Sequence, residues 1–394
     1  MLSLTPMTSS SDAGPALTAA GGVLTIDLSA LADNWRRLAE RVAPAECAGV
    51  IKANAYGTGL EPAARALFAA GCRTFFVAQV AEGVRARAAL GAAARIFVLN
   101  GLQARAEPAD YVAHRLAPIL GSPEELARWA PFAADGPACA IHLDTGMSRL
   151  GFASLDALEA ALAGYDHSRI ALIMSHFVSS EEQGDPLNDR QIALFDKARA
   201  LLPGVPASLA NSSGIFLAGR PFYDLVRPGY ALYGGNPTPA TPNPMRSVVR
   251  LEARIQQVRQ IEPGASVGYN AQWMAKRSTR LATLLIGYAD GLPRSAGATD
   301  QRSGADVIIA GRRCPLVGRV SMDLCVADVT DIPESAPRPG DSAVILGEEI
   351  SVDELGARAG TIGYQILTSL GARYRREYIP FSPQSGEKVA RSAG

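Results

Sequence analysis

The first strong pattern along the chain places apolar residues every three or four positions, which predicts an amphipathic helix. The residues are Leu28, Leu31, Trp35, Leu38 and Val42, and this spacing puts them on one helical face. Amphipathic segments also occur later, at Glu82–Leu90, Leu155–Tyr165 and Arg190–Leu202.

Eight short apolar runs read as buried strands, and helical patterns lie between most of them. The runs are Cys47–Ile51, Thr74–Gln79, Arg95–Asn100, Leu116–Leu120, Ala138–Leu143, Ile170–Ser175, Pro206–Ala210 and a run that starts at Leu225. Strands that alternate with helices in this way predict an α/β fold whose N-terminal part is a (β/α)8 TIM barrel.

The pattern changes near residue 245, where alternating apolar residues and turn signals predict a mostly β C-terminal domain. Gly311-Arg312 is predicted to be a hairpin turn, and Val352–Ala359 a short helix. Val23–Ile26 reads as a lone strand that can join the sheet of this second domain. We therefore expect a disordered leader at 1–21, the barrel at 22–245, the β domain at 246–382 and a frayed tail at 383–394.

Composition and charge exclude several functional classes. The 394 residues carry 38 basic and 38 acidic side chains, so no net field attracts nucleic acid or an anionic membrane surface. No apolar run is long enough to span a membrane. The five cysteines lack zinc-site spacing, and the N-terminus lacks a basic secretory start, so we expect reduced thiols in a cytoplasmic protein. His and carboxylate pairs at ligand spacing are missing, so no metal is predicted.

The residues after the predicted strands carry the candidate chemistry, because barrel enzymes place catalytic groups at the carboxyl ends of their strands. Lys52 follows the first strand, where partial burial lowers the pKa of an amine; a surface lysine with its stem along apolar neighbours is the alternative. Other strand ends supply Arg149, His176, Ser212 and Arg227-Pro228-Gly229-Tyr230.

Ser212 and Gly229 suit a phosphate site, since such sites often follow strands seven and eight at the start of a helix. A helix is expected to begin at Asn211-Ser212-Ser213-Gly214, although these residues also suit an ordinary N-cap and turn. A lysine and a phosphate cradle without a metal fit a pyridoxal-phosphate enzyme. An aldolase acting on a sugar phosphate would offer the same two features, so the residues alone leave both open.

Nine motifs in order make the pattern far more specific. They are VIKANAYGTG (50–59), HLDTGMSRLGF (142–152), MSHF (174–177), ANSSG (210–214), VRPGYALYG (226–234), VGYNAQW (267–273), GYADG (287–291), GRVSMD (318–323) and GTIGY (360–364). With these motifs the chain resembles the alanine racemases, which are pyridoxal-phosphate enzymes with a barrel and a C-terminal β domain. The resemblance covers roughly residues 22–380.

The resemblance implies a role for each matching residue. Lys52 would hold pyridoxal 5′-phosphate covalently and act as one catalytic base, and Tyr269 of the other subunit of a homodimer would be the second base, tuned by His176. Arg227 would face the pyridine nitrogen. The phosphate would be held by Tyr56, Ser212, Gly229, Tyr230 and Tyr364. Arg149, Met322 and Asp323 would bind the carboxylate of alanine, and the entrance of the site would be lined by Tyr288, Arg294 and Arg319.

One position departs from the family pattern. Many alanine racemases carry a carbamylated lysine that orients the neighbouring arginine where this chain has His142, so the orientation of Arg149 needs another explanation, and a simply packed strand residue is the alternative for His142. The function implied is the interconversion of L- and D-alanine for peptidoglycan. A broader amino-acid racemase, a barrel-type decarboxylase and a non-catalytic cofactor carrier are the competing readings.

Overall fold

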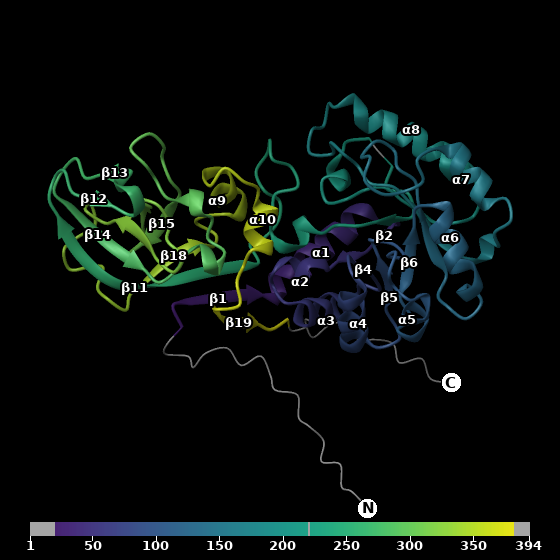
Figure 1. The fold of residues 1–394 in the computed structure, drawn as a ribbon, viewed down its shortest axis with the longest axis horizontal. Coiled ribbons are helices and arrows are strands. Elements are labelled where there is room, and N and C mark those ends of the chain that lie inside the picture. The colour runs from purple at the N-terminus through teal and green to yellow at the C-terminus, as the bar shows by residue number, and fades with distance from the viewer. Residues whose placement is uncertain (1–19, 220, 382–394) are drawn as a thin grey trace, which may run out of the picture. The chain divides into compact units, whose positions relative to one another are not determined.

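The computed structural model describes residues 20–219 and 221–381, which form two compact units (Figure 1). The barrel unit comprises residues 27–248 and 379–381, and the β unit comprises residues 20–26 and 249–378. The predicted leader lies outside the described residues except for residues 20 and 21, and the predicted tail lies wholly outside them.

Parallel strands form the centre of the barrel unit. Seven follow one another in sheet order: β3 (Gly49–Val50), β4 (Thr74–Val77), β5 (Arg95–Val98), β6 (Ala117–Leu120), β7 (Cys139–His142), β8 (Ile170–Met174) and β9 (Ala207–Ser208). The predicted first strand is interrupted at Ala48, so β2 (Glu46–Cys47) pairs with β10 (Leu225–Val226), whereas β3 pairs with β4. Asp224 and Arg227 donate backbone hydrogen bonds to Ala207 and Ala210. These bonds continue the ring from β9 to β10, and the predicted (β/α)8 barrel is confirmed.

Helices alternate with these strands along the chain. They are α1 (Leu28–Val42), α2 (Lys52–Tyr56), α3 (Leu60–Ala70), α4 (Val80–Leu90), α5 (Pro108–Ala113), α6 (Pro123–Trp129), α7 (Leu155–Leu162) and α8 (Pro186–Ala200). Asp27 caps the start of helix α1, because its carboxylate accepts a hydrogen bond from the Ala30 N–H at 2.8 Å. The helix buries the five residues of its predicted apolar face. Helices α1, α3 and α4 pack side by side (Figure 1).

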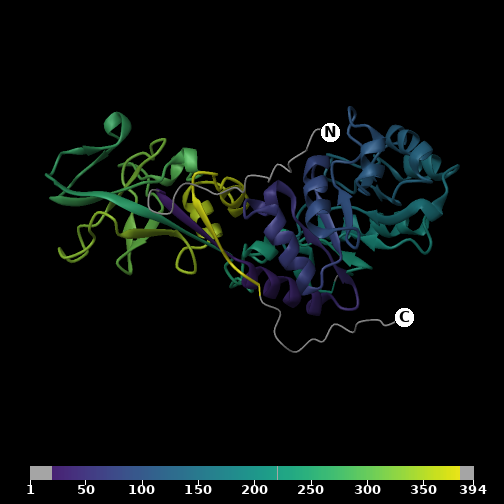
Figure 2. The same cartoon turned by 90° about the horizontal axis from the view of Figure 1, so that it is seen from below.

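A long twisted sheet dominates the β unit. Its order is β16 (Arg312–Pro315), β15 (Asp306–Ile309), β18 (Ser342–Leu346), β11 (Val249–Ile261), β1 (Gly22–Asp27) and β19 (Arg375–Ile379); β14 (Thr279–Leu284) joins β11 to β17 (Cys325–Asp328). Strand β1 lies between β11 and β19 (Figures 1 and 2), so the lone strand ahead of the barrel does join this sheet. A hairpin of β12 (Ser266–Val267) and β13 (Trp273–Met274), and helices α9 (Val352–Arg358) and α10 (Gly363–Thr368), complete the unit.

Two local predictions need correction. The hairpin turn between β15 and β16 is Ala310-Gly311 rather than Gly311-Arg312, because Arg312 pairs with Ile309 as the first residue of β16. Both turn residues have positive φ, 48° and 74°, as a two-residue hairpin turn with the twist of its strands requires. The helix expected at Asn211-Ser212-Ser213-Gly214 is a single 3-10 turn over Gly214–Phe216.

Candidate active site

Four charged or titratable side chains meet where the barrel strands end. Lys52 follows β3, Arg149 lies beyond β7, His176 follows β8 and Arg227 follows β10. Electrostatic effects link them, since Arg149 and Arg227 both lower the pKa of Lys52, and the pKa of His176 is lowered by Arg227, Lys52 and Arg149. The structure therefore brings these predicted site residues together.

The Lys52 amine has a lowered pKa. Burial is the largest cause, and the Arg149 guanidinium adds to it, whereas the Glu82 carboxylate opposes the shift. A lower pKa raises the fraction of neutral amine, which is the form that attacks a carbonyl carbon. The structure therefore supports a chemical role for Lys52 rather than that of a surface lysine.

The backbone between Lys52 and Tyr56 is left-handed. Four consecutive non-glycine residues, 53–56, have φ between 51° and 54°, and Gly57 follows with φ 80°. Each costs roughly 1–2 kcal/mol relative to a right-handed helical conformation, so neighbouring groups must stabilise the turn. Internal hydrogen bonds from Ala55 to Ile51 and from Gly57 to Ala53 contribute to this. We call residues 53–56 the left-handed turn.

Tyr56 ends the left-handed turn and is buried at its far side. Its ring stacks on that of Tyr233, with 4.7 Å between centroids, and burial raises the pKa of its hydroxyl. A Cβ atom on Gly229 would lie 2.3 Å from the Tyr56 hydroxyl oxygen, so this position has to be glycine for the hydroxyl to occupy its place. The two residues predicted to share a phosphate are thus in direct contact.

Hydroxyl and backbone N–H groups converge beside this contact. The buried Ser212 hydroxyl accepts hydrogen bonds from the N–H groups of Gly229 and Ala231, at 3.0 and 3.2 Å, and the Tyr230 side chain between them is buried. Because the Ser212 oxygen accepts both bonds, its own O–H is the group that can donate to a phosphate oxygen. The donor set therefore fits a phosphorylated cofactor at the position predicted from the sequence.

Arg227 is buried, only 4% exposed, and binds atoms of the barrel rather than water. It donates to the Ser208 hydroxyl at 2.5 Å, to the Ser175 carbonyl and, at 3.4 Å, to Nδ1 of His176. Burial lowers the pKa of its guanidinium to about 9, so the group remains a cation and a pure donor at neutral pH.

His176 is neutral and has a defined tautomer. Burial and the cation of Arg227 hold its pKa well below 6.5. Because Nδ1 accepts from Arg227, the proton lies on Nε2, which can donate a hydrogen bond.

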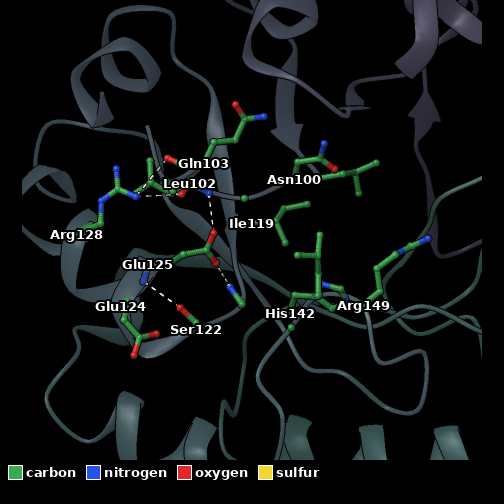
Figure 3. Close-up of a pocket in the computed structure, with 16 residues that line it drawn as sticks. Asn100, Leu102, Gln103, Ile119, Ser122, Glu124, Glu125, Arg128, His142 and Arg149 are labelled. Carbon is green, nitrogen blue, oxygen red and sulfur yellow. Dashed lines mark hydrogen bonds between the residues drawn. The ribbon is translucent and has the colours of Figure 1, made fainter. Parts of the chain in front are cut away.

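A cavity of about 640 Å³ adjoins these groups, with His142 and Arg149 in its wall (Figure 3). Burial, followed by the Arg227 cation, lowers the pKa of His142 to about 4, so this histidine is neutral at pH 7. On another side of the cavity the Glu125 carboxylate accepts hydrogen bonds from the N–H groups of Gly121 and Leu102, at 2.6 and 3.1 Å (Figure 3).

The remaining predicted residues lie in the β unit. Tyr269 starts the turn between β12 and β13 and is 62% exposed. A Cβ atom on Gly268 would lie 2.9 Å from the backbone N of Arg319, so this glycine lets the Tyr269 turn pack against Arg319. Arg294 lies in a short 3-10 helix and Tyr364 in α10.

Backbone hydrogen bonds join the segments that carry Tyr288 and Met322. The N–H of Tyr288 donates to the Ser321 carbonyl at 3.1 Å, and that of Ala289 donates to the Met322 carbonyl at 3.0 Å. The Tyr288 and Met322 side chains are 41% and 53% exposed. The structure thus brings Tyr288, Met322 and Asp323 together within the β unit.

Sequence reasoning missed two sets of supporting residues. Arg373 holds both carboxylate oxygens of Asp290, at 2.7 and 2.8 Å, and bonds Asp323 at 2.7 Å. Glu82 and Arg85 of α4 bond the left-handed turn. Asp290 lies inside the motif GYADG, but no local pattern indicates its partner 83 residues away.

Two features are absent from residues 20–219 and 221–381. No helix there is long and apolar enough to cross a membrane, and no cluster of three or more His, Cys, Asp or Glu side chains there could bind a metal ion.

A parallel barrel with a lysine of lowered pKa and a hydroxyl-lined cradle at its strand ends defines a class of enzymes that bind a phosphorylated carbonyl compound through an amine. The family model "Alanine racemase, N-terminal domain" matches residues 26–237, and "Alanine racemase, C-terminal domain" matches residues 248–378. The chain belongs to the alanine racemase family.

Individual relatives agree with this assignment. An alanine racemase of Methylobacterium sp. (strain 4-46) is 54% identical over 365 residues, covering 91% of this chain and 98% of that protein. A catabolic alanine racemase of Mesorhizobium japonicum is 46% identical over 367 residues, covering 92% and 94%. The crystal structure of alanine racemase from Bartonella henselae with covalently bound pyridoxal phosphate has a TM-score of 0.85 at 39% identity, covering 91% of this chain and 100% of that one. The predicted family, isomerase class and cofactor are confirmed.

The left-handed turn predicts that a glycine substitution within it stabilises the protein. Ala53→Gly should raise the free energy of unfolding by about 0.5–1 kcal/mol, because glycine removes the left-handed penalty and this exposed alanine loses little packing. Ala88→Gly, exposed in the right-handed helix α4, should lower it by about 0.5–1 kcal/mol. Urea unfolding of both variants measures the difference, and the same sign in both would contradict the left-handed geometry.

The neutral state of His142 predicts a pH dependence of stability. Its pKa is about 4 when folded and about 6.5 when unfolded, so the unfolded chain binds the extra proton between these values. The free energy of unfolding is therefore unaffected by this group above pH 6.5. It decreases as the pH falls towards 4, by up to roughly 3 kcal/mol. Urea unfolding at several pH values should show a shallower decline for His142→Gln than for the wild type. Parallel curves would show that His142 is not held neutral.

Proposed function

We propose that the protein interconverts L- and D-alanine with pyridoxal 5′-phosphate, using Lys52 and Tyr269 as bases on opposite faces of the substrate. The observation that carries the proposal is the half-buried amine of Lys52, whose pKa is lowered by burial and by two nearby guanidinium groups. When bound, pyridoxal phosphate withdraws electrons from the α-carbon and so acidifies its proton. The chain must then hold the cofactor and move one proton.

Several of the predicted residues would hold the cofactor. Lys52 would bind its carbonyl carbon, Arg227 would donate toward the pyridine nitrogen, and the phosphate would be held by Tyr56, Ser212, Gly229, Tyr230 and Tyr364. The hydroxyl and N–H cradle in the barrel unit supports this assignment. Because an arginine only donates, the ring nitrogen is not protonated by its partner. This argues against the decarboxylase reading, since such enzymes usually place a carboxylate there.

Two bases are needed because racemisation removes a proton from one face of the α-carbon and returns one to the other. Lys52 serves one face and Tyr269 the other. A tyrosine base reacts as a phenolate, which a nearby hydrogen-bond donor stabilises. The Nε2–H of neutral His176, fixed by Arg227, is the donor we assign to Tyr269.

We propose that each site is shared across a homodimer. The β unit exposes large apolar side chains at Tyr269, Tyr288 and Met322, and the barrel unit exposes Leu150 and Val178. Such side chains favour burial against a second copy. Tyr269, Met322 and Asp323 of one subunit would then complete the site of the other, with Tyr288, Arg294 and Arg319 at its entrance.

Arg149 and the Met322–Asp323 segment would bind the substrate carboxylate, and the tyrosines around them favour a side chain as small as a methyl group. The five cysteines are buried free thiols, which supports action in the reducing cytoplasm. The product D-alanine would serve peptidoglycan synthesis. Because one relative is a catabolic enzyme, rescue of a D-alanine auxotroph tests this direction separately.

Attachment of the cofactor to Lys52 can be mapped directly. The chain has only four lysines, at 52, 197, 276 and 388, so borohydride reduction and peptide mass spectrometry should label the Lys52 peptide alone. Lys52→Ala should lower alanine racemisation by on the order of a thousandfold or more, whereas Lys197→Ala, on the exposed face of α8, should retain it. Label on another lysine would refute the assignment. A labelled protein that releases carbon dioxide would be a decarboxylase, and one without turnover a carrier.

Mixing two inactive variants tests the shared site. Lys52→Ala and Tyr269→Phe are each expected to be inactive, but a mixed dimer has one site with both native residues if the two come from different subunits. Refolding an equal mixture should restore about a quarter of the wild-type activity. The two variants refolded separately are the control. If mass measurement shows mixed dimers but no activity returns, Lys52 and Tyr269 of each site belong to the same subunit.

A further inference from the structure

Helix α4 holds the left-handed turn at two points. The Glu82 carboxylate accepts a hydrogen bond from the Ala53 N–H at 2.6 Å, and the Arg85 guanidinium donates to the Asn54 side-chain oxygen at 3.1 Å. Residues three apart on a helix share a face, so one face of α4 supplies both contacts.

Both side chains also bind groups outside the turn. The second carboxylate oxygen of Glu82 accepts from the N–H groups of Ala78 and Gln79, at 2.9 and 3.2 Å, where β4 gives way to α4. Arg85 is bound by both carboxylate oxygens of Glu61 in α3, at 2.7 and 2.8 Å. A shift of either group would therefore break hydrogen bonds to α3 or to the start of α4.

The turn needs such support because its conformation is unfavourable for non-glycine residues. It also connects two site residues. Lys52 directly precedes the turn, and Tyr56, whose hydroxyl packs against Gly229, is its last residue. A change in the turn therefore alters the distance between the amine and the phosphate cradle.

We propose that Glu82 is a positioning residue of the active site, whose carboxylate fixes the Ala53 N–H and thereby sets the Lys52 amine relative to the Tyr56 hydroxyl. The assignment rests on the function proposed for Lys52. Glu82 does not react; it joins the start of the left-handed turn to the N-terminus of α4. It is also the anionic group beside Lys52, opposing the effects of burial, Arg149 and Arg227.

Two conservative variants of Glu82 distinguish the effect of its side-chain length from the effect of its charge. Glu82→Asp keeps the charge and a favourable helix N-terminus, but its shorter side chain cannot span Ala53 and the Ala78–Gln79 N–H groups together. The kcat for alanine should fall about tenfold with KM changed less than about threefold, as a small misplacement of a reacting group predicts. Glu82→Gln loses the charge and keeps one acceptor oxygen, which can still accept from the Ala53 N–H if its NH2 replaces the oxygen facing Ala78 and Gln79, so kcat should fall less than about threefold.

The second readout is the reactivity of Lys52 in the full-length protein after cofactor removal. Acetylation by acetic anhydride, followed by mass on the Lys52 peptide, gives the pH midpoint of its amine, with Lys197 and Lys276 as internal references. Glu82→Gln should move this midpoint to lower pH, because it removes an opposite charge, whereas Glu82→Asp should leave it close to the wild type. Glu46→Asp and Glu46→Gln are matched controls, since Glu46 bonds Thr74 at the opposite ends of the strands.

The proposal is overturned if Glu82→Asp retains the wild-type kcat, or if Glu82→Gln leaves the Lys52 midpoint unchanged. A loss of thermal stability alone, shared with the Glu46 variants, would identify a purely structural role and also overturn it. The acetylation midpoint does not depend on turnover. If the function proposed for Lys52 is wrong, borohydride labels another residue while the midpoint still responds to Glu82.

Discussion

Burial of one amine beside two guanidinium groups is the interaction on which the site depends. Water stabilises the ammonium form of lysine, and the barrel removes much of that water from Lys52 while placing Arg149 and Arg227 nearby. The result is an amine that gives up its proton more readily than one in solution. Arg227 donates its hydrogen bonds to Ser208 and Ser175 of the barrel, so its cation is held in place near the amine.

The backbone that positions these groups is strained, because residues 53–56 are left-handed. A right-handed continuation after β3 would send the chain away in a different direction, whereas the left-handed turn places Tyr56 against Gly229 and the stacked ring of Tyr233. Short polar contacts from α3 and α4 compensate for the unfavourable dihedral angles. Strain at a site supported by the surrounding elements is a recognised way of pre-organising reactive groups.

Much of the fold could be predicted because its signals are local. Short stretches of sequence are enough to show the apolar spacing in α1, the buried runs of the barrel strands and the residues at the ends of these strands. The interruption at Ala48, the left-handed turn and the 3-10 turn after Ser213 depend on contacts between distant segments. So do Arg373 with Asp290, and Glu82 with Ala53, because no spacing rule links residues that meet only after folding. The roles proposed for Tyr269 and Tyr364 rest on the family resemblance, since an isolated tyrosine carries no such signal.

The placement of β1 has a consequence for synthesis. This strand leaves the ribosome before any part of the barrel, yet its partner β11 starts at Val249, after the last barrel strand. The nascent barrel can therefore assemble while β1 is still without its neighbour, and the second unit closes only when the carboxyl-terminal third of the chain emerges. One polypeptide thus interrupts a β domain with an inserted barrel, and the order of translation completes the inserted part before the domain that surrounds it.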